Sequence, residues 1–301
     1  MASTDVIHAE PDLQPSRAAN APKGASAGAN SRLNYLEPKG DPGLFGPDSM
    51  AWRVHANPVA LAVGGVAAVI LELAEPRVRT GVWEHSIFRT DPLTRMRRTG
   101  EATMITTYGP TAAARARIEM VNRMHARVGG KTPEGQAYRA SDADILTWVH
   151  VTASYGFLNG YVRFVDPGLS LAEQDRYYAE SEAVGSGFGA VNLPRSVAEV
   201  ADFIAEWRGK LAPHAIIGEF LQIVSSTSPI GPVGRLIQPL VLEGALEILP
   251  PWARDQLKLP DHPGRRAVGL PALRAMALLS RPGPASTPAQ ACRRMGLALA
   301  R

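Results

Sequence analysis

The sequence predicts an all-α protein, a single helical domain of roughly ten helices. Capping side chains precede the apolar stretches, apolar residues recur at intervals of three and four, and alternating strand-like runs are missing. We expect the helical domain at residues 51–280. A mobile segment rich in Ala, Gly, Ser and Pro is expected at residues 1–50, and a tail at residues 281–301.

Local signals mark where individual helices begin and end. Asn57–Pro58 and Asp91–Pro92 each place a capping side chain before a proline, which suits the first helical turn. Three capping boxes are predicted, at the pairs Ser141 and Asp144, Ser170 and Glu173, and Ser196 and Glu199. The glycine pair 129–130 is a helix stop, and TMITTYG at residues 103–109 is the only stretch that favours a strand.

The amino-acid composition excludes several kinds of site. The 301 residues include one cysteine, Cys292, which excludes an intramolecular disulfide, a cysteine-based zinc site and an iron–sulfur cluster. The N-terminus lacks the pattern of a signal peptide. The apolar run PVALAVGGVAAVIL, residues 58–71, is shorter than the roughly 20 residues of a spanning helix. We therefore expect a cytoplasmic protein with no membrane span.

Positive charge is concentrated in one region. Residues 95–139 contain nine Lys or Arg against three Glu, although the whole chain has a net charge of only +4. A solvated helix surface, an anionic ligand and nucleic acid are the three interpretations. Nucleic acid is disfavoured because aromatic residues make up only 6% of the chain and no binding motif is present.

Two histidines lie in strongly apolar helical segments. His125 shares one helical face with Ile118, Val121 and Val128, and His150 lies within DILTWVHVTASYGFLNGY. Each could be a core histidine whose ring nitrogens are bonded to backbone or side chains. Each could instead bind a metal, because one histidine is enough to hold a haem between helices.

The segment before His125 carries a second candidate feature. Arg95, Arg98 and Thr99 stand at positions i, i+3 and i+4 and therefore share one helical face. Two guanidiniums and a hydroxyl could bind haem propionates or polarise bound oxygen. A surface patch without a ligand is the alternative. Phosphate-loop, zinc-protease and serine- or cysteine-nucleophile signatures are all missing.

The sequence resembles the family that includes the rubber oxygenase (latex clearing protein) catalytic domain and the mycophenolic-acid-pathway oxygenase of the mpaB type. The resemblance runs from about Asn57 to Leu279 and rests on five ordered segments: EHSIFRTDPLTRMRRT, VNRMHARVGG, LTWVHVTASYGFLNGYVRF, LPRSVAEVADFIAEW and LPPWARDQLKLP. It implies a globin-like helical fold with a haem pocket between helices. It also implies haem b held by one axial histidine, and the use of O₂ to cleave carbon–carbon double bonds.

Carried over by position, the family's Arg-x-x-x-Thr pair falls on Arg95 and Thr99, and its haem-ligand histidine falls on His125. His150 takes the position of a second histidine that supports the pocket. The chain departs from the rubber oxygenases where Arg98 replaces a lysine beside the threonine. Arginine keeps its proton in proteins, so it cannot become an iron ligand in that place.

The rubber oxygenases also use an acidic residue near the haem as a base. Glu84 and Glu75 are the upstream candidates, and neither matches the spacing, so this base is Glu84, Glu75 or absent.

We therefore predict a haem b-dependent oxygenase whose partners are O₂ and a small lipophilic substrate. Two alternatives remain open at this point, a haem peroxidase-like enzyme and a non-catalytic helical scaffold that has kept the fold. No residue pattern indicates an oligomeric state.

Overall fold

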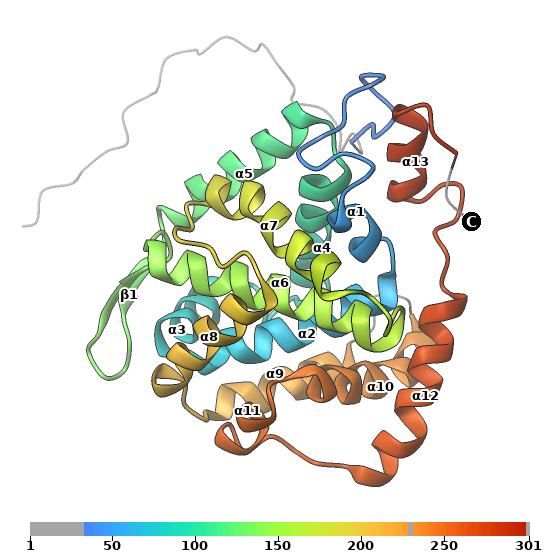
Figure 1. Cartoon of the computed structure of the whole chain (residues 1–301). Helices are drawn as coiled ribbons and strands as arrows, with labels where there is room; N and C mark the ends of the chain where they lie inside the picture. Colours follow the sequence, from blue (N-terminus) through green and yellow to red (C-terminus); the bar gives the residue numbers. More distant parts are fainter. Residues whose placement is uncertain (1–32, 228–230, 299–301) are drawn as a thin grey trace, which may run out of the picture. The chain divides into compact units, whose positions relative to one another are not determined.

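The computed structural model describes residues 33–227 and 231–298, which are predominantly helical (Figure 1). This part of the chain contains thirteen α-helices, one 3-10 turn and one two-stranded antiparallel sheet. The helices are α1 (Met50–His55), α2 (Pro58–Ala74), α3 (Pro76–His85), α4 (Pro92–Tyr108), α5 (Thr111–His125), α6 (Ala143–Phe164), α7 (Leu171–Phe188), α8 (Val197–Trp207), α9 (Ala215–Ser226), α10 (Pro232–Ile248), α11 (Pro251–Gln256), α12 (Pro263–Leu279) and α13 (Thr287–Arg294). The strands are β1 (Gly129–Lys131) and β2 (Ala137–Arg139), and the 3-10 turn is η1 (Arg208–Lys210). The expectation of a mostly helical protein is confirmed.

Helices α2 and α6 form the centre of the fold, and their backbones touch. A Cβ atom added at Gly64 would lie 2.4 Å from the carbonyl oxygen of Gly156, and one added at Gly156 would lie 2.2 Å from that of Gly64. Gly160, one turn further along α6, makes the same close approach to the backbone of Ala60. The apolar run that is too short for a membrane span is therefore a buried helix of the core.

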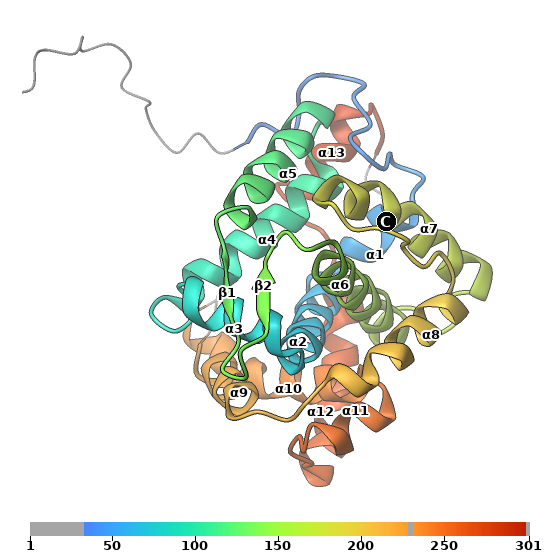
Figure 2. The same ribbon diagram turned by 90° about the vertical axis from the view of Figure 1, so that its left-hand side faces the viewer.

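The other helices pack around this crossing. Helices α3, α9, α10 and α12 contact α2, and α7, α8 and α10 contact α6 (Figures 1 and 2). Helix α8 is held by aromatic stacking, since the ring centroids of Trp148 and Trp207 lie 4.6 Å apart. Its sequence supplies the apolar face for this contact at Val200, Ile204 and Trp207.

Polar contacts fasten residues 33–49 and α13 to the start of α5. The Asp41 carboxylate accepts hydrogen bonds from the backbone N–H and the hydroxyl of Thr111, and Arg294 donates to the backbone carbonyls of Asp41 and Tyr35. Of the segment expected at residues 1–50, residues 1–32 lie outside the described part. The division into three segments stays a prediction.

Most of the predicted helix starts are confirmed. Asn57 and Asp91 cap α2 and α4 before their prolines, and Ser170 forms both arms of a capping box with Glu173. Ser196 accepts from the N–H of Glu199, but that carboxylate bonds to the N–H of Arg195 instead. The capping box predicted at Ser141 is wrong. Helix α6 begins at Ala143, and the Asp144 carboxylate pairs with Arg77 at 2.8 Å.

The strand preference of residues 103–109 is also overridden. These residues continue α4 to Tyr108, because the hydroxyl of Thr106 bonds back to the carbonyl of Ala102 and the last turn is buried. The only strands in residues 33–227 and 231–298 are β1, which contains the glycine pair 129–130, and β2. Gly130 pairs with Tyr138 there, and the Tyr138 ring fills the space left by the missing glycine side chains.

Within the described residues, no single helix is long and apolar enough to cross a membrane. The bent pair of α2 and α3 meets the length and composition requirement only when the two helices are taken together.

Candidate functional site

Helices α4 and α5 form an antiparallel hairpin that places Arg95 across from His125. The chain turns at Gly109 and Pro110, the two helices contact each other (Figure 2), and the Arg95 charge acts on the His125 imidazole. Asp91 sets the start of α4 by accepting the N–H of Thr94. Two candidate residues thirty positions apart in the sequence are therefore neighbours.

Arg95 and Thr99 are joined directly, as their spacing on one helical face predicts. The Nη1 atom of Arg95 donates to the hydroxyl of Thr99, which in turn donates to the carbonyl of Arg95 at 3.0 Å. The Nε atom of Arg95 donates to the hydroxyl of Ser86 at 3.2 Å. These contacts hold the guanidinium in one orientation beside the end of α5.

The His125 imidazole is a neutral ring with an unsatisfied nitrogen. Burial lowers its pKa, and the positive charge of Arg95 lowers it further. Its Nδ1 atom is buried and has no hydrogen-bond partner within the described residues. A buried, unbonded imidazole nitrogen is costly unless a ligand or metal uses the ring. His125 therefore fits a metal-binding role better than the role of a satisfied core histidine.

Glu72 on α2 adds a carboxyl that sequence reasoning missed. Desolvation raises its pKa to about 7, while the nearby Arg95 charge and a hydrogen bond from Thr152 lower it. The hydroxyl of Thr152 on α6 lies 3.5 Å from Glu72 Oε1. An acidic residue near the end of an otherwise apolar helix was the available signal, because a carboxyl in such surroundings becomes desolvated.

His150 lies in a different environment, between α6 and α7. Burial lowers its pKa to about 4, and its Nε2 atom lies 3.3 Å from the hydroxyl of Ser181 and 3.5 Å from that of Ser154. A Cβ at Gly185 would lie 2.7 Å from the His150 ring, so α7 packs tightly against it. No hydrogen bond within the described residues joins His150 to Arg95, Thr99 or His125.

A family model described as ER-bound oxygenase mpaB/B′ and rubber oxygenase, catalytic domain, matches residues 52–281. The chain belongs to this family. Neither the curated proteins nor the solved structures contain a match to the chain.

The other candidate residues make no hydrogen bond or ion pair with Arg95, Thr99, His125 or Glu72 in the described part of the chain. Arg98 is exposed, and its side chain has no hydrogen bond or ion pair among the residues that the structure describes. Glu75 is occupied as the N-cap of α3, where it accepts from the N–H of Val78 at 2.7 Å and pairs with Arg77. Glu84 is exposed near the end of α3. Among these acidic residues, Glu72 is the one with a desolvated carboxyl near the Arg95 charge.

His55 shows what a satisfied core histidine looks like in this member of the family. Its Nδ1 atom lies 2.8 Å from the hydroxyl of Thr107, and its Nε2 atom lies 2.9 Å from that of Tyr177. Both nitrogens are therefore paired, and burial lowers the pKa of His55 to about 3. His125 differs from His55 in this respect, because its Nδ1 atom has no hydrogen-bond partner among the described residues.

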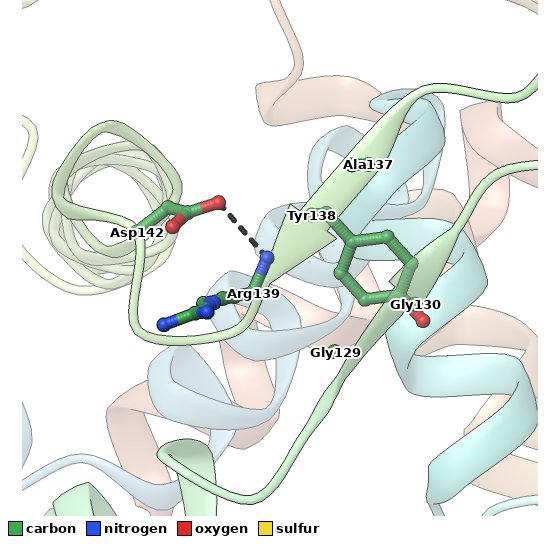
Figure 3. Close-up of a pocket in the computed structure, with 6 residues that line it drawn as sticks. All are labelled: Gly129, Gly130, Ala137, Tyr138, Arg139 and Asp142. Carbon is green, nitrogen blue, oxygen red and sulfur yellow. Dashed lines mark hydrogen bonds between the residues drawn. The ribbon is translucent and has the colours of Figure 1, made fainter.

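A separate open pocket of about 450 Å³ lies at the β-hairpin that follows α5 (Figure 3). Its lining residues are Gly129, Gly130, Ala137, Tyr138, Arg139 and Asp142. The backbone N–H of Arg139 donates to the Asp142 carboxylate at 2.9 Å, which closes one side of the pocket. None of the Arg95, His125 and Glu72 side chains lines it.

Within residues 33–227 and 231–298, no group of three or more His, Cys, Asp and Glu side chains could hold a metal ion. This finding concerns sites with several protein ligands, whereas a haem iron needs only one protein side chain.

Proposed function

We propose that this protein is a haem b-dependent oxygenase whose partners are O₂ and a small lipophilic molecule. Membership of the mpaB and rubber oxygenase family supports the oxygenase class. The single observation that carries the haem assignment is the buried Nδ1 atom of His125, which has no hydrogen-bond partner in the described chain. Neutral imidazole is the form that binds iron, and the lowered pKa of His125 provides this form at neutral pH.

The residues around His125 have complementary roles in this proposal. When bound, haem supplies the iron at which O₂ is activated for the cleavage of a carbon–carbon double bond. Arg95 would bind the anionic propionates or polarise O₂ through its guanidinium, and Thr99 holds that guanidinium in place by accepting a hydrogen bond from it. We place the haem in a globin-like pocket between the helices that carry these residues.

Glu72 is the proton acceptor in the proposal. A carboxyl with a pKa of about 7 is divided between its protonated and ionised forms at neutral pH. The carboxylate can therefore take a proton from the substrate and return it later. Thr152 orients the carboxyl from α6, and the Arg95 charge favours the ionised form that accepts the proton.

His150 and Arg98 are assigned supporting roles. His150 connects α6 to α7 through its contact with Ser181, and it also lies within reach of Ser154 on its own helix. Arg98 adds positive charge beside Arg95 and cannot lose its proton to become an iron ligand.

We also propose that the protein works in the cytoplasm, a reducing compartment that suits a chain with a single cysteine. Localisation of a fluorescent fusion tests this point, and export across the cell membrane contradicts it.

The absorption spectrum of protein purified from haem-supplied cells tests the central claim. We expect a Soret band, together with stoichiometric uptake of hemin by protein prepared without haem. His85→Ala is the matched control, because His85 is exposed on α3 and is not one of the candidate site residues. A colourless protein that takes up no hemin would instead be a helical scaffold.

A further inference from the structure

The outer face of α12 is apolar although it is open to solvent. Val268, Ala272, Ala275 and Leu279 recur at intervals of four, three and four, so they form one stripe along the helix. All four are exposed, and Val268 and Leu279 expose 75% and 83% of their surface. We call these four residues the α12 stripe. It extends over roughly 16 Å at the rise of an α-helix.

The opposite face of α12 already belongs to the core. Leu270, Leu273 and Ala277 are buried there, and Gly269 admits the side chain of Leu240 from α10. Helix α12 therefore carries two apolar faces, which are separated by Arg265 and Arg274. In the described part of the chain, protein covers only one of these faces.

Helix α10 extends the exposed apolar surface. Leu236 lies one helical turn before Leu240, the residue that meets α12, and 79% of its surface is exposed. Leu236, Val268 and Leu279 are the three most exposed large apolar residues in residues 33–227 and 231–298. All three lie on two helices that pack together (Figure 1). Grouped apolar exposure of this kind marks an interaction surface.

The unpaired charge near the stripe is positive. Residues 262–298 contain six arginines and no lysine, aspartate or glutamate. Arg265 and Arg274 flank the stripe on opposite sides of the helix. Arg265 pairs with Glu243 at 3.5 Å, whereas Arg274 and Arg281 are exposed and have no ion pair among the described residues. A partner that covers the stripe must therefore be negatively charged at its rim.

We propose that the α12 stripe docks the protein peripherally on an anionic lipid bilayer. Val268 and Leu279 enter the boundary between headgroups and acyl chains, while Arg274 and Arg281 meet anionic headgroups. A second copy of this chain is a poorer occupant. A symmetric contact would bring Arg274 and Arg281 of two copies together, and the nearby acidic side chains Glu243 and Asp261 already pair with Arg265 and Arg266. The proposal is independent of the oxygenase assignment.

Vesicle co-sedimentation tests the docking with the full chain. One set of vesicles contains phosphatidylcholine alone, and the other contains phosphatidylcholine and phosphatidylserine at about 3:1. We expect binding to the anionic vesicles only, and weaker binding as salt is raised. The double variant Val268→Ser, Leu279→Ser is expected to bind at least about tenfold more weakly. Leu171→Ser is its control, because Leu171 is 66% exposed on α7, away from the stripe.

Charge-reversing substitutions measure how much the arginines contribute to vesicle binding, apart from the apolar residues. Arg274→Glu is expected to reduce binding by about tenfold, and Arg139→Glu, an exposed arginine on β2, is expected to leave binding unchanged. Circular dichroism confirms that each variant is folded. Failure of the wild-type chain to bind anionic vesicles overturns the proposal, as does equal binding by the double variant. A dimer in analytical ultracentrifugation that Val268→Ser, Leu279→Ser abolishes also overturns it, because the stripe would then be covered by a second copy.

Discussion

Arg95 faces His125 across the α4–α5 hairpin, and its charge acts together with burial to lower the pKa of the imidazole. The same guanidinium bonds to Thr99 and opposes the effect of desolvation on the pKa of Glu72. One arginine therefore links the candidate iron ligand, the candidate donor hydroxyl and the candidate base.

The Arg95→Ala variant tests this link. Because the positive charge is lost, the pKa values of both His125 and Glu72 should rise. Haem retention or reaction with oxygen should weaken while the protein stays folded. Arg97→Ala is the matched control, since Arg97 is exposed on the same helix. Unchanged haem content and unchanged oxygen reactivity in Arg95→Ala would contradict the assignment.

The His125→Ala variant tests the iron ligand. We expect a folded, helical protein with little or no haem, and recovery of haem binding when free imidazole fills the vacated space. Absorption spectra measure haem content, and circular dichroism confirms folding. Full haem occupancy with an unaltered axial-ligand spectrum would rule out His125.

The His150→Ala variant should show the opposite pattern. Its hydrogen bonds to Ser181 and Ser154 serve packing, so the variant should keep much of its haem and lose about 1–3 kcal/mol of unfolding free energy. Denaturant titration measures the loss. Loss of haem in His150→Ala and its retention in His125→Ala would exchange the two roles.

The Glu72→Gln variant should change how stability depends on pH. The pKa of Glu72 is raised from 4.5 to about 7 in the folded state. Between pH 4.5 and about pH 7, the Glu72 carboxyl is ionised in the unfolded chain and largely protonated in the folded protein. The contribution of this residue to the free energy of unfolding therefore falls as pH rises through this range, by roughly 3 kcal/mol in total. Above about pH 7 and below about pH 4.5 its contribution is constant.

The difference in unfolding free energy between wild type and Glu72→Gln, measured across this pH range, isolates the carboxyl from the histidines that titrate nearby. A difference that does not vary with pH would show that Glu72 is not desolvated. Glu75→Gln is not a suitable control, because Glu75 caps α3.

The Gly156→Ala variant tests the α2–α6 crossing. The new methyl group would lie 2.2 Å from the carbonyl oxygen of Gly64, which is backbone, so the helices must separate. We expect a loss of about 1–3 kcal/mol. Gly100→Ala on α4 meets no atom within 4 Å and should be neutral or stabilising. Chemical denaturation of both variants gives the comparison, and equal stability would show that α2 and α6 adjust freely.

The sequence by itself determined the mostly helical class, the starts of α2, α4 and α7, and the pairing of Arg95 with Thr99. Each depends on residues within one helical turn, because caps, N-terminal prolines and i, i+4 contacts act locally. The capping box at Ser141 and the strand at residues 103–109 failed because tertiary contacts outweighed equally local preferences.

Only the tertiary structure decided which polar groups share one environment. Glu72, Arg95 and His125 come from α2, α4 and α5, and their pKa shifts depend on burial and on distances between these helices. The same holds for the difference between His125, with an unpaired nitrogen, and His55, with both nitrogens bonded. Desolvation and Coulomb interactions act through space, so a pattern along the chain carries no measure of them.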